Sequence, residues 1–336
     1  MEGENGSSRK PEPPKSGERA TTTLSGTVAN GMSNGTSDGL MSDGVVLVEG
    51  VNAVRSGSEP VASPPSTMQS PEGKADDETN LESVKEDRLV KLLRANVEKL
   101  NPETTSVDDS TLRRFLRARQ GKVDKATDMF MEHFEWRRTY VPLGYVPESE
   151  IPNELGAEKM FLQGRDKCGR PIGVALVAKH DATKRNLEEL KKYNVYVLDK
   201  SVASINPGEE KFNLIADLRG FQYKNVDLRG WAIGIEFLQG HYPERIQKIF
   251  VVHVPYIFWG AWKIISQFID KRTMEKIVFV EDKNLEVVLS KDIDKDQLPK
   301  FYGGELDLVP IQAAPTPNWP PKKANRCEHP IKQLGS

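Results

Sequence analysis

Hydrophobic residues recur at helical spacing between about Leu81 and Gly144, and this pattern predicts three helices. The first helix ends before Pro102, and the acidic cluster beyond it is suited to cap the second. The second, Leu112 to Arg119, is short and very basic, and the third opens at Asp124. In the first helix the residues at this spacing are Leu89, Leu92, Leu93, Val97 and Leu100, and in the third the inward-facing residues are Ala126, Met129, Phe130 and Phe134. We expect the three helices to pack into one compact lobe.

From Met160 onward, stretches with the composition of strands alternate with stretches that have helical spacing. Alternation of this kind indicates an α/β domain with a mostly parallel sheet. The expected strands are Met160–Gln163, Pro171–Val177, Phe212–Ala216, Ile249–Val254 and Ile277–Val280. The expected helices are Leu187–Ala203, Val226–Gln239, Tyr256–Ile269 and Leu285–Ser290.

The expected helix Tyr256–Ile269 is unusually apolar. Its strongly polar members, Lys263, Ser266 and Gln267, fall at i, i+3 and i+4, so a helix would carry one thin polar stripe. Such a helix is either deeply buried or meets an apolar partner, and we interpret that partner as lipid. Its large apolar side chains include Tyr256, Phe258, Trp259, Trp262, Ile265 and Phe268.

The two ends of the chain differ in composition from this body. Residues 1–80 contain no Phe, Trp or Tyr, and their twelve acidic and six basic residues give a net charge of −6. Such a segment cannot bury enough apolar surface to offset its chain entropy. We therefore expect a disordered acidic tail (1–80), a helical lobe (81–145), an α/β domain (146–309) and a Pro-rich C-terminal extension (310–336) on which Trp319 can dock.

Charge and cysteine content exclude several classes of protein. The 49 acidic and 47 basic residues nearly cancel, so we expect no nucleic-acid partner. Cys168 and Cys327 form neither a disulfide framework nor a metal site, and a cytoplasmic location is expected. We expect a soluble monomer rather than a membrane-spanning protein, because the apolar stretch Ile249–Ile269 is interrupted by His253, Pro255 and Lys263.

Five motifs occur in a fixed order along the chain: the basic helix Leu112–Arg119, then Asp166–Pro171, Asp217–Gly220, Tyr242–Arg245 and Leu298–Gly304. Together they resemble the signature of Sec14-like, or CRAL-TRIO, lipid-transfer proteins, and the likeness runs roughly from Leu81 to Val309. The chain looks most like the plant-type, single-domain members of that family. The resemblance implies a helical N-terminal lobe and a lipid-binding lobe, in which a sheet floors an apolar pocket and a mobile helix gates its mouth. That gate matches Tyr256–Ile269.

The resemblance also implies which residues hold the ligand. In members that bind phosphatidylinositol, the positions that match Arg119, Glu244, Thr273 and Lys276 hold the headgroup. In the member that binds phosphatidylcholine, hydroxyl residues occupy the positions that match Phe212 and Leu214. Neither of these side chains can donate a hydrogen bond, so the resemblance puts that mode of phosphatidylcholine binding in doubt.

Each of these residues also has an ordinary structural interpretation. Glu244 next to Arg245 could form a surface ion pair, and Trp259 and Trp262 could be plain core residues. Arg113, Arg114, Arg117 and Arg119 would ordinarily form a solvated helix face. We expect several of them to brace acidic residues between the two lobes.

We expect no enzyme, no catalytic residue, no metal and no cofactor apart from a bound lipid. The hydrolase pattern G-x-S-x-G occurs at Gly35–Gly39, in the acidic tail, with no strand before it and no helix after it. The expected function is that of a carrier of phospholipid, chiefly phosphatidylinositol, which visits membrane surfaces transiently. Two alternatives stay open: a carrier of a sterol, tocopherol-like or isoprenoid ligand, and a sensor that presents lipid to a lipid kinase.

Overall fold

The computed structural model describes residues 73–317 and 319–321, which lie within one compact unit of the chain. Most of the predicted acidic tail, and residues 322–336 of the predicted extension, therefore lie outside the described residues. The first described helix, α1 (Gly73–Leu100), begins earlier than the expected start near Leu81.

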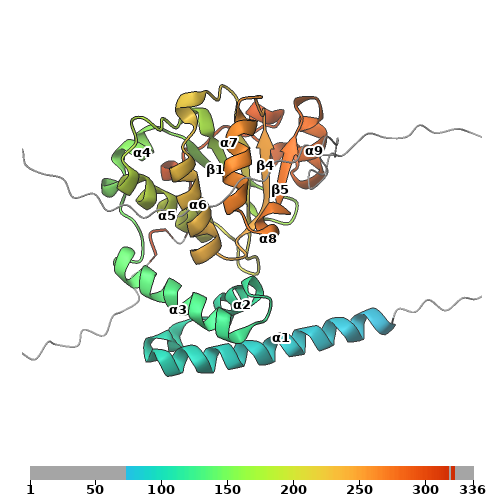
Figure 1. Ribbon diagram of the computed structural model, residues 1–336. Coiled ribbons are helices and arrows are strands. Elements are labelled where there is room, and N and C mark those ends of the chain that lie inside the picture. The colour runs from blue at the N-terminus through green and yellow to red at the C-terminus, as the bar shows by residue number, and fades with distance from the viewer. Residues whose placement is uncertain (1–72, 318, 322–336) are drawn as a thin grey trace, which may run out of the picture. The chain divides into compact units, whose positions relative to one another are not determined.

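The N-terminal lobe consists of α1, α2 (Asp109–Ala118) and α3 (Val123–Tyr140), as Figure 1 shows. The side chain of Asp108 caps α2 by accepting from the backbone N–H of Thr111 at 2.8 Å. The apolar stripes of the three helices meet in one core, formed by Val90, Leu93, Val97, Leu112, Phe115, Leu116, Ala126, Met129 and Phe130.

The second lobe is built on a five-stranded sheet in the order β1-β2-β3-β4-β5. Strand β1 pairs with β2 antiparallel, and the remaining neighbours are parallel. The strands are β1 (Met160–Arg165), β2 (Pro171–Leu176), β3 (Phe212–Asp217), β4 (Ile246–Val252) and β5 (Ile277–Val280). The expected mixed α/β fold with a mostly parallel sheet is thus confirmed.

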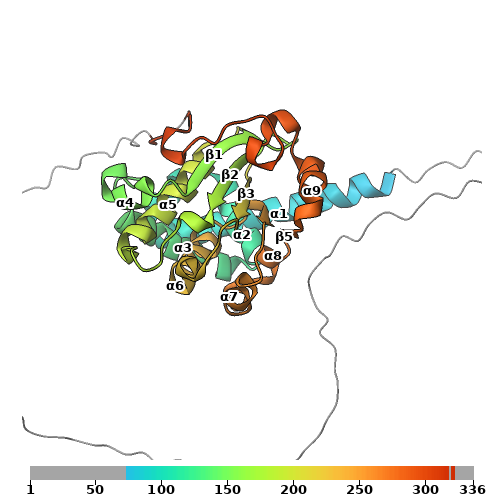
Figure 2. The same cartoon turned by 90° about the horizontal axis from the view of Figure 1, so that it is seen from above.

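Helices cover both faces of the sheet (Figure 2). On one face lie α5 (Leu187–Ala203), α6 (Leu228–His241) and α7 (Phe258–Ile265), and on the other lies α9 (Leu285–Asp292). Strand residues alternate between the two faces, as the period of two requires. Ile215 of β3 therefore packs in the core on the side of α9, whereas its neighbour Leu214 packs toward α5 and α6.

Several element boundaries differ from the predicted ones. The expected gate helix Tyr256–Ile269 is α7 followed by a 3-10 turn, Ser266–Phe268. Two short helices were not predicted, α4 (Pro152–Gly156) and α8 (Lys271–Met274). Asp270 caps α8 by accepting from the N–H of Thr273 at 2.8 Å, which turns the chain directly after the gate.

The described part of the C-terminal extension packs against the second lobe. The N–H of Leu162 in β1 donates to Val309 O at 3.0 Å, and Ile311 is buried. The ring of Trp319 stands edge-on to Tyr196, with 5.4 Å between centroids, so the docking expected of Trp319 is present. This segment covers the edge strand β1, whose backbone would otherwise offer unpaired hydrogen-bonding groups.

Candidate functional site

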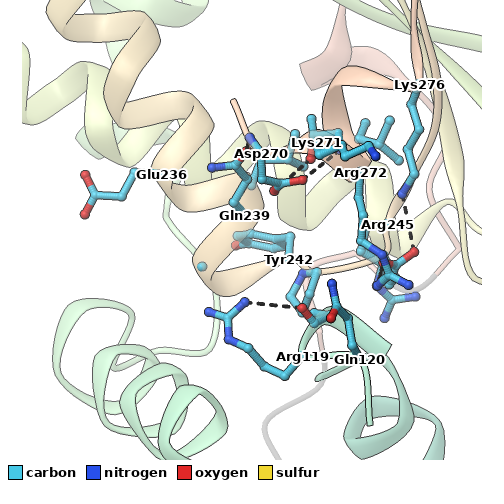
Figure 3. Close-up of a pocket in the computed structure, with 17 residues that line it drawn as sticks. Arg119, Gln120, Glu236, Gln239, Tyr242, Arg245, Asp270, Lys271, Arg272 and Lys276 are labelled. Atoms are coloured by element: carbon cyan, nitrogen blue, oxygen red, sulfur yellow. Dashed lines mark hydrogen bonds and ion pairs between the residues drawn. The ribbon is translucent and has the colours of Figure 1, made fainter. Parts of the chain in front are cut away.

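The four residues expected to hold a headgroup meet on one cavity of about 470 Å³ (Figure 3). Arg119 ends α2, Glu244 lies in the turn between α6 and β4, Thr273 belongs to α8, and Lys276 precedes β5. The cavity is thus built from both lobes, by segments more than a hundred residues apart in the sequence.

Glu244 is the carboxylate at the centre of this group. Its Oε1 lies 3.0 Å from Nη1 of Arg272 and its Oε2 lies 3.3 Å from Nζ of Lys276. Its backbone is left-handed, with φ of +58°, a conformation that costs a non-glycine residue free energy. Arg272 also donates to the backbone oxygen of Arg117, so the same guanidinium joins α2 to the turn that carries Glu244.

Arg119 and Thr273 have few polar contacts. The Arg119 guanidinium donates to the backbone oxygen of Ala118 at 3.4 Å, and no described carboxylate pairs with it. The hydroxyl of Thr273 donates to Asp270 at 3.2 Å. The Arg119 guanidinium therefore keeps N–H donors for a ligand, whereas the Thr273 hydroxyl must leave Asp270 before it can donate to one.

Positive charge exceeds negative charge around the cavity. Its lining includes three acidic residues, Glu236, Glu244 and Asp270, and five basic ones, Arg119, Arg245, Lys271, Arg272 and Lys276. Burial, and after it the nearby Arg114, lowers the pKa of Arg245 to about 10. The net charge of +2 suits an anionic group.

Lys271 and Arg272 also line the polar cavity, although they were not predicted as site residues. Their signal was present, because they form a basic pair directly before Thr273. It was not recognised because two adjacent cations are most often a solvated surface.

A second cavity, of about 390 Å³, lies between the sheet and helices α5, α6 and α7, and its walls are mostly apolar. Alternate residues of β3 line it, together with apolar residues of α5 and α6 such as Leu190 and Trp231. Five of the eight residues predicted for the gate and pocket line this cavity: Phe212, Leu214, Phe258, Trp262 and Ile265.

The other three predicted gate residues do not line that cavity. Tyr256, Trp259 and Phe268 are 93%, 38% and 55% exposed. The gate segment therefore has an inner face on the cavity and an outer apolar face on the surface. Helix periodicity predicts that side chains will divide in this way, but not which ones face inward.

The polar and apolar cavities are adjacent and share part of their walls, because Leu238 and Ile246 line both.

Among residues 73–317 and 319–321, no cluster of potential metal ligands occurs. Within the same residues, no helix is long and apolar enough to cross a membrane.

Comparison with known proteins agrees with this geometry. The CRAL/TRIO domain model matches residues 145–304, and the CRAL/TRIO N-terminal domain model matches residues 66–132. A CRAL-TRIO domain-containing protein of Saccharomyces cerevisiae is 30% identical over 248 residues, which cover 67% of this chain and 79% of that protein.

Two further proteins extend the comparison. The phosphatidylinositol transfer protein CSR1 of Eremothecium gossypii is 26% identical over 211 residues, which cover 59% of this chain and 47% of that protein. The crystal structure of Sfh5 shares the fold, with a TM-score of 0.52 at 19% identity over 63% of this chain and 77% of that one. The chain spans less than half the length of several curated relatives that it matches.

The two-lobed fold and the matches to both domain models show that this chain is a protein of the CRAL-TRIO class. Within that class, the chain belongs to the Sec14-like family. Members of this family bind and transfer lipids and are generally not enzymes.

Proposed function

We propose that this protein binds phosphatidylinositol and carries it between or at membranes, with the headgroup in the polar cavity and the acyl chains in the apolar one. The observation that carries the proposal is the meeting of Arg119, Glu244, Thr273 and Lys276 on a cavity with a net charge of +2 that shares its wall with an apolar cavity. The name of the Eremothecium gossypii relative, a phosphatidylinositol transfer protein, adds support.

The chemistry of the headgroup matches these side chains. A phosphodiester needs fixed positive charge, which Lys276 and Arg119 supply. In the proposal the Thr273 hydroxyl exchanges Asp270 for a phosphate oxygen. The inositol hydroxyls can donate to Glu244, whose two oxygens otherwise pair with Arg272 and Lys276. Ligand binding would therefore exchange one set of Glu244 partners for another.

The acyl chains explain why the apolar cavity needs a lid. Burial of each CH₂ group contributes about 0.8 kcal/mol, so exposing two chains of about 15 methylenes each to water would cost roughly 24 kcal/mol of free energy. Helix α7 lines the cavity with Phe258, Trp262 and Ile265 and exposes apolar side chains outside. In our proposal it opens where its outer face meets a bilayer and closes over the chains in water.

The lining of the cavity favours phosphatidylinositol over phosphatidylcholine in this scheme. Phe212 and Leu214 line it from β3 and offer no side-chain hydrogen-bond donor to a choline phosphate. In this proposal the protein is a monomer that acts in the cytoplasm and associates peripherally with membranes. It can also present its lipid to a lipid kinase. It needs no nucleic acid, metal or cofactor.

Transfer of labelled phosphatidylinositol between liposomes tests the proposal. Lys276→Ala removes a charged donor, so the transfer rate should fall about tenfold or more. The matched control is Lys300→Ala, because Lys300 forms an exposed ion pair with Asp307 and lines neither cavity. If Lys276→Ala transferred phosphatidylinositol at the wild-type rate, the headgroup assignment would be wrong.

The lipid that accompanies the purified protein offers a second test. We expect mass spectrometry to detect phosphatidylinositol in the wild type and to find much less of it in Lys276→Ala. Detection of a sterol or isoprenoid alone would favour the other class of carrier.

A further inference from the structure

Two ionisable side chains lie on the wall of the apolar cavity, at positions that the headgroup proposal does not use. Lys159 directly precedes β1, and His180 follows the 3-10 helix Val177–Lys179. Each is only 8% exposed. Burying such groups beside a hydrocarbon-lined space is unfavourable unless they are hydrogen-bonded, so their placement needs a physical explanation.

Their partners form a chain of contacts. Lys159 Nζ pairs with the carboxylate of Glu154 and lies 3.0 Å from His180 Nδ1. His180 Nε2 lies 3.0 Å from Asp227, which also pairs with Arg185. Because an ammonium can only donate, Nδ1 accepts from it, and the imidazole is neutral with its proton on Nε2. Burial, the largest cause, lowers the pKa of His180 in agreement with that state.

The arrangement places the Lys159 ammonium on the cavity, with His180 beside it, and the carboxylates away from the cavity. Lys159 and His180 line the cavity, whereas Glu154, Asp227 and Arg185 do not. Two acidic and two basic residues with one neutral histidine give the cluster no net charge. The wall therefore presents a polar group with balanced charge, unlike the polar cavity with its excess of cations.

One hydrogen-bond donor of Lys159 remains available. An ammonium has three N–H groups, and Glu154 and His180 accept two of them. No other described residue accepts the third, and the nearest aromatic ring, that of Tyr193, has its centroid 5.0 Å from Nζ. An oxygen atom inside the cavity would complete the hydrogen bonding of this buried group.

The distance between the cluster and the polar cavity determines how far from the headgroup that oxygen lies in a bound lipid. Gly230 and Trp231, near the start of α6, line the apolar cavity with the cluster, whereas Glu236, Gln239 and Gly240, near its end, line the polar one. Gln239 follows Gly230 by nine helical positions, a rise of about 14 Å. That distance is within the length of an ordinary acyl chain, so the oxygen belongs far along the chain from a headgroup.

We propose that Lys159, positioned by His180, forms a subsite for an uncharged oxygen, a hydroxyl or a carbonyl, on an otherwise hydrocarbon chain. The balanced charge of the cluster disfavours a carboxylate, and the surrounding apolar wall requires hydrocarbon on the rest of the ligand. This chemistry is found in an oxygenated acyl chain of a phospholipid and in a free long-chain alcohol or ketone. The inference rests on lipid binding in the apolar cavity and is independent of the headgroup residues.

Competition for the wild-type protein tests the subsite. The protein is incubated with equal amounts of phosphatidylinositol carrying a stearoyl or a 12-hydroxystearoyl chain, and separately with octadecanol, octadecane and stearate. Native mass spectrometry then measures which species are bound. We expect about tenfold enrichment of the oxygenated species in at least one arm, and the arm identifies the source. Equal loading of oxygenated and plain chains in both arms, or preference for stearate over octadecanol, overturns the proposal.

A variant pair assigns the preference to the cluster. The double substitution Glu154→Gln with Lys159→Met removes the donor without leaving a buried carboxylate unpaired, and it should abolish the enrichment while plain chains still load. The control Ser201→Ala changes another buried polar residue of the same cavity and should keep the enrichment. Enrichment that persists in the double variant contradicts the assignment, and the wild-type competition decides the proposal even if the double variant fails to fold.

The two proposals can fail separately. Lys276→Ala should lower phosphatidylinositol transfer without changing the preference for octadecanol over octadecane. If the headgroup assignment is wrong, the alcohol arm still tests the subsite.

Discussion

Nδ1 of His133, in α3, is buried and has no hydrogen-bond partner among the described residues. The His133 ring lies 5.1 Å from that of Phe115 and 5.6 Å from that of His241, whose Nδ1 is likewise buried and unpaired. Burial lowers the pKa of His133 to about 3 and that of His241 to about 4. Both histidines, which lie where α3 packs on α6, are therefore neutral at pH 7.

The folded pKa of His133 lies below its unfolded value of about 6.5, so the unfolded chain binds more protons in that window. The free energy of unfolding should therefore decrease as the pH falls from about 6.5 toward 3, by up to about 1.4 kcal/mol per pH unit from His133. Urea unfolding at several pH values should show a smaller loss for His133→Leu than for the wild type. Carboxylates titrate in both proteins and contribute to both curves. An identical dependence on pH in the wild type and in His133→Leu would contradict the prediction.

At the scale of single elements, the gate segment combines two environments within four turns. Phe258 and Ile265 are buried on the apolar cavity, whereas Ile264 and Phe268 are exposed. An exposed apolar face on a short helix beside an apolar cavity is suited to contact a bilayer.

Phe268→Asp should weaken association with phosphatidylinositol-containing vesicles by about tenfold or more, because burial of a phenyl ring contributes about 1.5–3 kcal/mol. The melting temperature should change little, because Phe268 is exposed. Gln267→Asp adds the same charge one position earlier, at an exposed polar residue, and should have a smaller effect. Co-sedimentation measures both variants, and equal losses for the two would mean that charge alone, rather than the apolar face, matters.

The Leu298–Gly304 motif also has a physical basis at this scale. Gly303 has φ of +86°, and a Cβ atom on Gly304 would lie 1.9 Å from the backbone oxygen of Leu298. Glycine is therefore required for the chain to turn back on itself after Leu298. In this motif the resemblance reports backbone geometry rather than ligand chemistry.

At the scale of the whole molecule, ion pairs join the lobes that together form the polar cavity. Nη1 of Arg114, in α2, lies 2.9 Å from Glu210, which precedes β3, and Arg114 is only 5% exposed. Arg117 also reaches Glu210, at 3.4 Å, so the bracing expected of Arg114 and Arg117 is present. Arg113 instead pairs with Glu86 and Asp87 inside the N-terminal lobe.

Glu210→Ala should lower the free energy of unfolding by about 1.5–3 kcal/mol, because it leaves the buried Arg114 without its carboxylate. Glu135→Ala is the matched control, since Glu135 pairs with Arg138 and both are about half exposed. Its effect should be within about 0.5 kcal/mol. Urea unfolding measures both, and a Glu210→Ala effect as small as that of the control would show that this pair does not join the lobes.

Local patterns were enough to predict the class of fold and the order of most elements. The apolar composition of Phe212–Ala216 and the helical spacing in Leu187–Ala203 depend on neighbours in sequence, so they can be recognised before folding. The short helices α4 and α8 were not predicted, because a helix of four or five residues has too few positions for a period. The motifs also led to Arg119, Glu244, Thr273 and Lys276, but their roles came from resemblance and stay predictions.

The sequence by itself therefore determined a two-lobed α/β protein of the Sec14-like family with an apolar helix beside a set of polar residues. Only the tertiary structure decided that those polar residues share one cavity with Lys271 and Arg272, and that Tyr256, Trp259 and Phe268 face outward. It also brought Lys159 and His180 together from separate segments. The physical reason is that cavities and charge balance arise from side chains far apart in sequence, whereas periodicity records only the neighbours of each residue.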